Sequence, residues 1–241
     1  MLAIKLMKKD KIMNTQDYLV LVNKTHILPE KSAAEMALGS NLVKVTSARG
    51  DFLLEEKTAD AFAALMKAVS EQTDFEIGVS DGFRTFEEQR ATYNEIKKQQ
   101  GKREANTSVA PAGASEHHTG LGVDYYVATP KNLTSFWTKV KGKLSGKSAA
   151  GEYINKGRRA VLALANDYGF IERYPSGAED TTGYPAEPWH LRFVGSPEKA
   201  HQIADWCKAK QAKDPSGKIY CFEDFIAENS SARTSSEEEM A

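Results

Sequence analysis

Residues 115–124 read SEHHTGLGVD, and this stretch places His117 and Asp124 on either side of Gly120 and Gly122. Glycine takes backbone conformations that other residues avoid, so the chain can fold back between the histidine and the aspartate. We therefore expect both side chains to face one point. An imidazole and a carboxylate that converge in this way are a candidate pair of metal ligands.

A second short stretch, residues 187–190, reads EPWH and supplies another carboxylate and another imidazole. Proline disfavours helical geometry at the residue before it, so Glu187 and His190 are not expected on one helix. The expected structure is a bent strand or a turn. Such a structure would present both side chains to the same cavity.

Together the two stretches hold the minimum set for a metal-dependent hydrolase. Zinc favours imidazole and carboxylate ligands, and a catalytic zinc keeps one position for water. The candidate ligands are His117, Asp124 and His190, and Glu187 is the candidate base. Each has a structural alternative, because a single histidine on a strand more often makes a hydrogen bond than binds a metal. Asp124 also suits a turn or strand end, and Glu187 a solvated loop.

The charge of the chain excludes some classes of function. Its 241 residues include 32 basic and 33 acidic side chains, for a formal net charge of -1. A polycationic nucleic-acid-binding surface is therefore not expected. No apolar run approaches the roughly 20 residues of a membrane span, and the amino terminus lacks the apolar segment of a signal peptide. Either the protein stays in the cytoplasm, or a leader or anchor is missing from this sequence.

Hydrophobic periodicity predicts helices separated by short strands. Strand patterns occur near 42–45 and 75–80, and the apolar run 18–23 suits a buried strand. Helices are predicted over 57–70, 85–99, 156–168 and 196–210, with caps at Thr85, Ser196 and Gly169. Without a regular βαβ repeat, this order predicts an α+β fold. We expect a single domain with a small antiparallel sheet flanked by helices and a zinc site in a cleft on the sheet.

Three regions lack these patterns. Residues 1–16 are predicted to form an N-terminal arm, and residues 129–151 a polar surface insertion rich in Lys, Ser and Gly. Residues 229–241 are an acidic, serine-rich tail whose composition predicts disorder. The folded domain is therefore expected over residues 17–228.

The two cysteines, Cys207 and Cys221, leave the redox environment open. They do not form a Cys-x-x-Cys pair, so a zinc–thiolate site is not expected. One interpretation is a pair of free, partly buried thiols. The other is a disulfide that staples the C-terminal segment, which implies an oxidising compartment.

A third stretch, residues 80–89, reads SDGFRTFEEQ and places Arg84 five residues before Gln89. Together with the stretches at 115–124 and 187–190, it resembles the VanY-type D-alanyl-D-alanine carboxypeptidases, within the lysostaphin and hedgehog-like metallopeptidase group. The three blocks stand in the family's order. The similarity runs from about residue 17 to about residue 228.

The resemblance implies a role for each candidate residue. The residues that correspond to zinc ligands are His117, Asp124 and His190, and Glu187 corresponds to the catalytic base. Arg84 is implied to stabilise the developing oxyanion or to anchor the substrate. The residues implied to contact substrate are Arg84, Gln89 and Ser115. The implied cofactor is Zn2+.

Three positions depart from the family's pattern. Gly122 stands where the family usually has alanine, Phe83 where tyrosine is common, and His118 where glutamine is common. By spacing, His118 competes with His117 as a ligand, although the motif favours His117. The insertion at residues 129–151 has no counterpart in the pattern.

The resemblance implies a zinc-dependent carboxypeptidase that removes the terminal D-alanine from peptidoglycan stem peptides. Alternatives with the same site are an L,D-carboxypeptidase on tetrapeptide stems and a D-Ala-D-Ala dipeptidase. A zinc-containing binding module without catalysis is disfavoured by Glu187, because such a module needs no base. The expected partner is the stem peptide or its precursor, and no nucleic acid. We expect a monomer at the extracytoplasmic face of the cell envelope, with the cytoplasm as the alternative.

Overall fold

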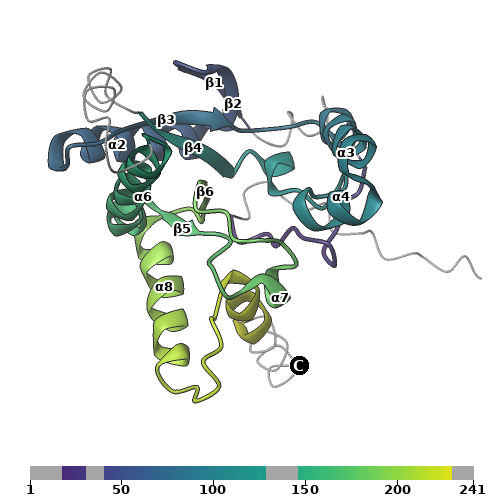
Figure 1. Cartoon of the computed structure of the whole chain (residues 1–241). Coiled ribbons are helices and arrows are strands. Elements are labelled where there is room, and N and C mark those ends of the chain that lie inside the picture. The colour runs from purple at the N-terminus through teal and green to yellow at the C-terminus, as the bar shows by residue number, and fades with distance from the viewer. Residues whose placement is uncertain (1–17, 31–40, 129–145, 230–241) are drawn as a thin grey trace, which may run out of the picture.

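The strands form two antiparallel sheets within residues 18–30, 41–128 and 146–229, which the computed structural model describes (Figure 1). The first is a hairpin of β1 (Leu42–Ser47) and β2 (Gly50–Glu55). The second has the order β3-β4-β6-β5. Its strands are β3 (Glu76–Asp81), β4 (Gly122–Ala128), β5 (Phe170–Glu172) and β6 (His190–Phe193). The predicted α+β class with a small antiparallel sheet is confirmed, and the hairpin adds a second sheet to it.

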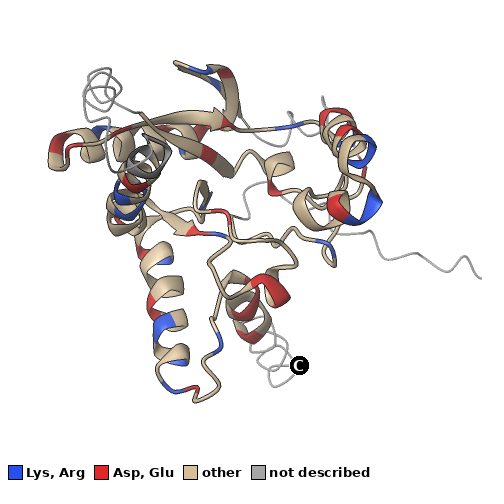
Figure 2. Ribbon diagram, in the orientation of Figure 1, with Lys and Arg blue, Asp and Glu red and all other residues tan. Residues whose placement is uncertain are grey.

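Helices fill the connections between the strands. The longer ones are α2 (Glu56–Gln72), α3 (Phe86–Gln100), α6 (Gly146–Ala165) and α8 (Pro197–Gln211). The shorter ones are α4 (Lys102–Ser108), α7 (Glu179–Thr182), and the 3-10 helices η1 (Glu116–Thr119) and η2 (Asn166–Tyr168). A last helix covers residues 222–229. Acidic and basic residues mix along α3 and α8 (Figure 2), and none of the helices in the described ranges is long and apolar enough to cross a membrane.

The predicted helix caps are confirmed. At the start of α3, the Thr85 hydroxyl accepts a hydrogen bond from the Glu88 amide and the Glu88 carboxylate accepts one from the Thr85 amide, a capping box. Ser196 caps α8, and Gly169 ends η2 with a φ of +81°. The capping box at Thr85 holds the backbone of its neighbour Arg84 at a well-defined helix start.

The four-stranded sheet has one apolar face, which α2 and α6 cover (Figure 1). Side chains alternate along a strand, so every second residue of β4 and β6 points to this face. The residues that do so are Val123, Tyr125, Val127, Leu191 and Phe193, each at most 7% exposed. The positions between them therefore lie on the opposite face, where the polar residues of the site gather.

Two predictions about local structure are wrong. Residues 18–23 form no strand. The carbonyls of Tyr18 and Val20 accept hydrogen bonds from a side chain, Arg192 Nη2 at 3.1 and 2.8 Å, instead of from a neighbouring strand. The helix predicted from residue 156 already begins at Gly146. The ring of Tyr153 packs on Phe75 with centroids 4.9 Å apart. This tertiary contact supports the first turns of α6, for which hydrophobic periodicity gave no signal.

The other regional predictions fall largely outside the described residues. Of the predicted insertion, residues 129–145 lie outside, and residues 146–151 belong to α6. The arm at 1–16 also lies outside, as does the tail beyond Asn229, the last described residue of the final helix. The domain limits 17–228 therefore stay a prediction.

Both cysteines are free thiols in the structure. Cys207 lies on α8, and Cys221 directly precedes the last helix. They line a common cavity of about 220 Å³ together with Ile203 and Phe222. The structure thus corresponds to the first of the two interpretations, the free thiols.

Candidate active site

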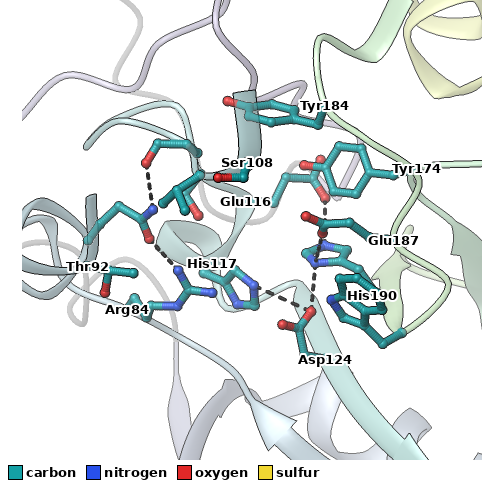
Figure 3. A pocket seen from close by; sticks show the side chains of 15 residues that line it. Arg84, Thr92, Ser108, Glu116, His117, Asp124, Tyr174, Tyr184, Glu187 and His190 are labelled. Carbon is teal, nitrogen blue, oxygen red and sulfur yellow. Dashed lines mark hydrogen bonds and ion pairs between the residues drawn. The ribbon is translucent and has the colours of Figure 1, made fainter. Parts of the chain in front are cut away.

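The candidate residues from all three sequence blocks line one cavity of about 140 Å³ (Figure 3). They are Arg84, Gln89, Ser115, His117, Asp124, Glu187 and His190. Arg84 follows β3, η1 carries His117, and Asp124 lies on β4. His190 begins β6. The cavity therefore lies on the polar side of the four-stranded sheet, where the fold prediction placed the site.

Asp124 and His190 meet because β4 and β6 are neighbours and their register aligns these two residues. Both point away from the apolar face, since the adjacent Val123 and Leu191 point into it. Asp124 Oδ1 lies 2.9 Å from His190 Nδ1. Gly122 leaves room beside the imidazole, because a Cβ there would lie 3.0 Å from His190 Nε2.

His117 reaches the same point from η1. Gly120 ends this turn with a φ of +69°, and a Cβ on it would lie 2.9 Å from the Glu55 amide nitrogen, so the fold-back needs glycine as expected. His117 Nδ1 donates a hydrogen bond to the Gly82 carbonyl at 2.6 Å. This bond fixes the tautomer and leaves Nε2, 3.6 Å from Asp124 Oδ1, as the nitrogen able to bind a metal.

The three side chains fit a zinc ion. One ligand atom from each of His117, Asp124 and His190 lies within 4.8 Å of the others. Asp124 Oδ1 and both ring nitrogens of His190 are buried and make no well-directed hydrogen bond to the described residues, despite their close approach. Buried polar atoms require partners. Two imidazoles and one carboxylate are also a known donor set of catalytic zinc sites.

The charges around this point also favour a cation. Burial raises the pKa of Asp124, but the adjacent His117 and His190 outweigh burial and hold this pKa below its usual range. Burial lowers the pKa of His190, whereas Asp124 and Glu116 outweigh it and raise this pKa to about 9. Without a metal, a proton on His190 thus balances the carboxylates, and metal binding would displace that proton.

Glu187 stands on a turn beside the ligand candidates. Its carbonyl accepts a hydrogen bond from the His190 amide at 2.9 Å, which closes the turn over Pro188 and Trp189. The expected turn is therefore present, with Glu187 Oε2 3.7 Å from His190 Nδ1. Burial raises the pKa of the Glu187 carboxyl; the charge of His190 opposes this rise, and that of Asp124 adds to it. A carboxylate with a raised pKa next to a metal site suits a general base.

Arg84 lines the opposite side of the cavity and is held by two side chains. Its Nε lies 3.1 Å from Asp81 Oδ2, and its Nη1 donates to Gln89 Oε1 at 2.6 Å. Gln89 in turn donates from Nε2 to the Ala110 carbonyl at 2.7 Å. The Gln89 amide thus fixes the guanidinium, and its predicted contact with substrate stays a prediction. The same holds for the buried Ser115.

His118 does not compete with His117 for a metal. Its Nδ1 donates to the Arg84 carbonyl at 2.7 Å, and its Nε2 accepts from the Gly113 amide at 3.0 Å. The ring also stacks on Phe86 with centroids 4.2 Å apart. Both nitrogens are therefore occupied, and the ring ties the backbone of Arg84 to the loop that precedes η1.

The cavity also contains side chains that the sequence reasoning missed. Among them are Glu116, Tyr174, Tyr184 and Trp189. The Tyr174 ring lies edge to face against Tyr184 at 5.5 Å and against His190 at 5.1 Å, so the two tyrosines line the cavity beside a ligand candidate. Glu116 lies in the sequence directly between two motif residues, Ser115 and His117, and this position was the only signal for it. Nothing in the pattern indicated its direction.

Comparison with known proteins agrees with this geometry. A family model described as VanY, D-alanyl-D-alanine carboxypeptidase, matches residues 51–196. The bifunctional D-Ala-D-Ala dipeptidase and D-Ala-D-Ala carboxypeptidase VanXYC of Enterococcus gallinarum is 30% identical over 185 residues, 77% of this chain and 86% of that protein. The putative carboxypeptidase YodJ of Bacillus subtilis is 29% identical over 185 residues, 76% of this chain but only 62% of that protein.

A solved structure shows the same relationship in three dimensions. The LdcB LD-carboxypeptidase, whose structure concerns peptidoglycan recognition, has a TM-score of 0.59 and 29% sequence identity. The match covers 83% of this chain and 88% of that one. The resemblance seen in the three sequence blocks is therefore confirmed over most of the chain, and the protein belongs to the VanY family of D-alanyl-D-alanine carboxypeptidases.

Proposed function

We propose that this protein is a zinc-dependent carboxypeptidase that removes the terminal D-alanine from peptidoglycan stem peptides. The observation that carries the proposal is the convergence of three metal-ligand candidates, His117, Asp124 and His190, with the carboxylate of Glu187 in one cavity. The cavity also holds the guanidinium of Arg84. Family membership gives the reaction class, and these side chains supply what that class of reaction requires.

Zinc at this position would supply a Lewis acid that polarises the scissile carbonyl. The chain's own residues carry the remaining steps. Glu187, buried and 3.7 Å from a ligand nitrogen, would take a proton from the attacking water and return it to the leaving amine. The rings of Tyr174 and Tyr184 line the same cavity as this carboxylate.

Arg84 is suited to a negative group on the substrate. Its Nη1 donates to Gln89, and its Nε lies 3.1 Å from Asp81 Oδ2 without a well-directed hydrogen bond to the described residues. A guanidinium held in this way can face a developing oxyanion or a free C-terminal carboxylate. Cleavage at a free carboxy terminus follows from the second possibility, and a peptide with an amidated terminus tests it. Equal cleavage of amide and free acid would indicate an endopeptidase.

An L,D-carboxypeptidase acting on tetrapeptide stems is the second candidate. The observation that favours it is the similarity to the LdcB LD-carboxypeptidase, at 29% identity. VanXYC, at 30% identity, bears both a dipeptidase and a carboxypeptidase name. The three reactions share one catalytic centre and differ in the substrate that the cavity accepts, so substrate length and stereochemistry must decide among them.

The test is incubation with defined stem peptides followed by mass measurement of the products. A D,D-carboxypeptidase shortens the pentapeptide by one alanine and leaves the tetrapeptide intact. An L,D-enzyme shortens the tetrapeptide, and a dipeptidase splits free D-Ala-D-Ala. All activity should stop with a chelator and return with zinc. Turnover that survives chelation would contradict the zinc proposal, and no turnover of any of the three substrates would contradict the enzyme class.

We further propose that the protein acts on the outer face of the cell envelope. The support is chemical: the proposed substrate is a cell-wall peptide. Fractionation of cells with detection of the untagged protein tests this location. Recovery of the protein in the cytoplasmic fraction alone would instead favour action on soluble precursors.

A further inference from the structure

Glu116 adjoins the ligand candidate His117 in the sequence, yet it contacts the other histidine, His190. Its side chain is completely buried. Oε1 accepts hydrogen bonds from Arg173 Nε at 2.7 Å and Arg192 Nη1 at 2.6 Å. Oε2 makes no hydrogen bond to the described residues and lies 3.6 Å from His190 Nε2. One oxygen of this carboxylate is thus fixed, and the other faces the imidazole.

The imidazole of His190 has two differently directed nitrogens. Nδ1 points to the cavity, 2.9 Å from Asp124 and 3.7 Å from Glu187, and is the atom placed to bind a metal. Nε2 points to Glu116. A ligand imidazole that binds through Nδ1 carries its proton on Nε2, and this proton needs an acceptor. At 3.6 Å the two atoms are slightly too far apart for a hydrogen bond, and a small tilt of the ring closes the gap.

We propose that Glu116 is a positioning residue for the metal site: its Oε2 accepts the Nε2 proton of His190 and so holds the ring with Nδ1 toward the metal. The inference rests on the zinc site of the proposed function and adds a residue to it. A carboxylate acceptor fixes the tautomer and makes the imidazole a more basic ligand.

The surrounding charges explain how a carboxylate can remain ionised at this depth. Arg173 and Arg192 are both 0% exposed and supply two positive charges next to Glu116. Glu223, from the last helix, accepts from Arg173 at 2.9 and 2.7 Å. Two guanidinium groups thus face two carboxylates, and the cluster is neutral. A buried charge is tolerated only with such pairing.

The same cluster joins distant parts of the chain beneath the site. Arg192 also donates to the carbonyls of Tyr18 and Val20, and Asn23 Nδ2 donates to Glu223 at 3.3 Å. These partners lie outside residues 51–196, the stretch that the family model matches. These contacts hold the side chains of Arg192 and Glu223 in place and, through the arginines, the carboxylate of Glu116. Oε2 of Glu116 therefore keeps a constant direction.

Glu116→Gln and Glu223→Gln form a matched pair of tests. Each removes one carboxylate charge from the same buried cluster, so both should lower the melting temperature by similar amounts. Only Glu116 faces His190. Zinc should therefore bind about 10–100-fold more weakly to Glu116→Gln, and within about threefold of wild type to Glu223→Gln. The affinity is measured by competition with a chelating dye, without reference to activity.

Nuclear magnetic resonance on the zinc-loaded wild type gives an independent measurement, which does not need the variant to fold. The Nε2 proton of His190 should exchange slowly with water and resonate downfield, as a proton bonded to a carboxylate does. Rapid exchange of this proton would overturn the proposal, as would equal zinc affinities of Glu116→Gln and wild type. Failure of the wild type to bind zinc would instead contradict the proposed function, so the two failures are distinguishable.

Discussion

Along β6, the residues on the two faces of the four-stranded sheet are buried to a similar degree by opposite chemistry. On one face, Leu191 and Val123 pack with α2 and α6 in an apolar layer. On the other, His190 and Arg192 are equally inaccessible, at 2% and 0% exposure, yet they belong to a layer of charged and polar groups. Successive residues of β6 alternate between these layers, so one short strand serves both.

The two faces have different roles: the apolar face stabilises the fold, and the polar face holds the candidate metal site. Burial of apolar side chains contributes free energy to folding in proportion to area. Buried ion pairs contribute little net stability, because desolvation offsets their attraction. The polar layer, with Glu116 between Arg173 and Arg192, is therefore better explained by the orientation of His190 than by stability. Substitutions on the two faces should accordingly separate metal binding from folding.

Replacement of His190 by alanine should have the largest effect. Two remaining ligands, His117 and Asp124, cannot close the coordination shell, so tight zinc binding and activity should both be lost. The measurement is zinc content after dialysis against a chelator. His118→Ala is the control and should keep its metal, because His118 bonds to Arg84 and Gly113 instead. Stoichiometric zinc in His190→Ala would disprove the ligand assignment.

Glu187→Gln should bind zinc normally and turn over stem peptide about 10²–10⁴-fold more slowly. The amide keeps the shape of the side chain but cannot accept the proton from water. Steady-state kinetics with the preferred stem peptide, together with a zinc determination, provide the check. Activity within a few-fold of wild type would remove Glu187 from the mechanism and restore the binding-module alternative.

Arg84→Lys should lower kcat/KM by about 10²–10³-fold, by analogy with the loss of one oxyanion donor. Lysine keeps the positive charge but loses the planar fork that Gln89 and Asp81 hold in place. Zinc affinity should stay unchanged, because Arg84 is not a ligand candidate. Wild-type kinetics in this variant would reduce Arg84 to a structural ion pair with Asp81.

Leu191→Ala probes the apolar face immediately next to His190. Removal of this side chain, 1% exposed, should lower the free energy of unfolding by about 2–5 kcal/mol through lost burial and a new cavity. The folded fraction should bind zinc as wild type does. Chemical denaturation of the metal-free protein gives the stability. A large loss of zinc affinity in the folded variant would show that the two faces are coupled and that their separation is wrong.

The smallest expected effect concerns the two thiols in the C-terminal part of the chain, Cys207 on α8 and Cys221 directly before the last helix. Burial raises the pKa of the Cys207 thiol to about 11, and the negative charge of Asp224 adds to this effect. Burial also raises the pKa of Cys221, and the negative charge of Glu223 adds to it. Both thiols should therefore stay protonated at pH 8 and react slowly with a thiol reagent, faster as the pH rises. Denaturation without reductant should release two thiols. Their absence would indicate a disulfide.

Much of the site was predictable because its residue types are chemically restrictive. Two imidazoles and two carboxylates in two short blocks suit few reactions, and the family resemblance added Arg84 from a third block. Each of these predicted residues lines one cavity. Gly120 was predictable for a backbone reason, since its φ of +69° suits only glycine well. Capping chemistry likewise predicted Thr85 and Gly169, because caps depend on a few adjacent residues.

The tertiary structure decided what depends on contacts between distant residues. Only strand register shows that Asp124 faces His190, and only packing shows that His118 has both nitrogens engaged. Glu116 looked like one more charge in a motif, whereas the fold surrounds it with Arg173 and Arg192. Side-chain direction is determined by where the backbone is placed, and that placement sums contacts over the whole chain. Local sequence therefore specified the chemistry of this site, and the fold specified which atoms meet.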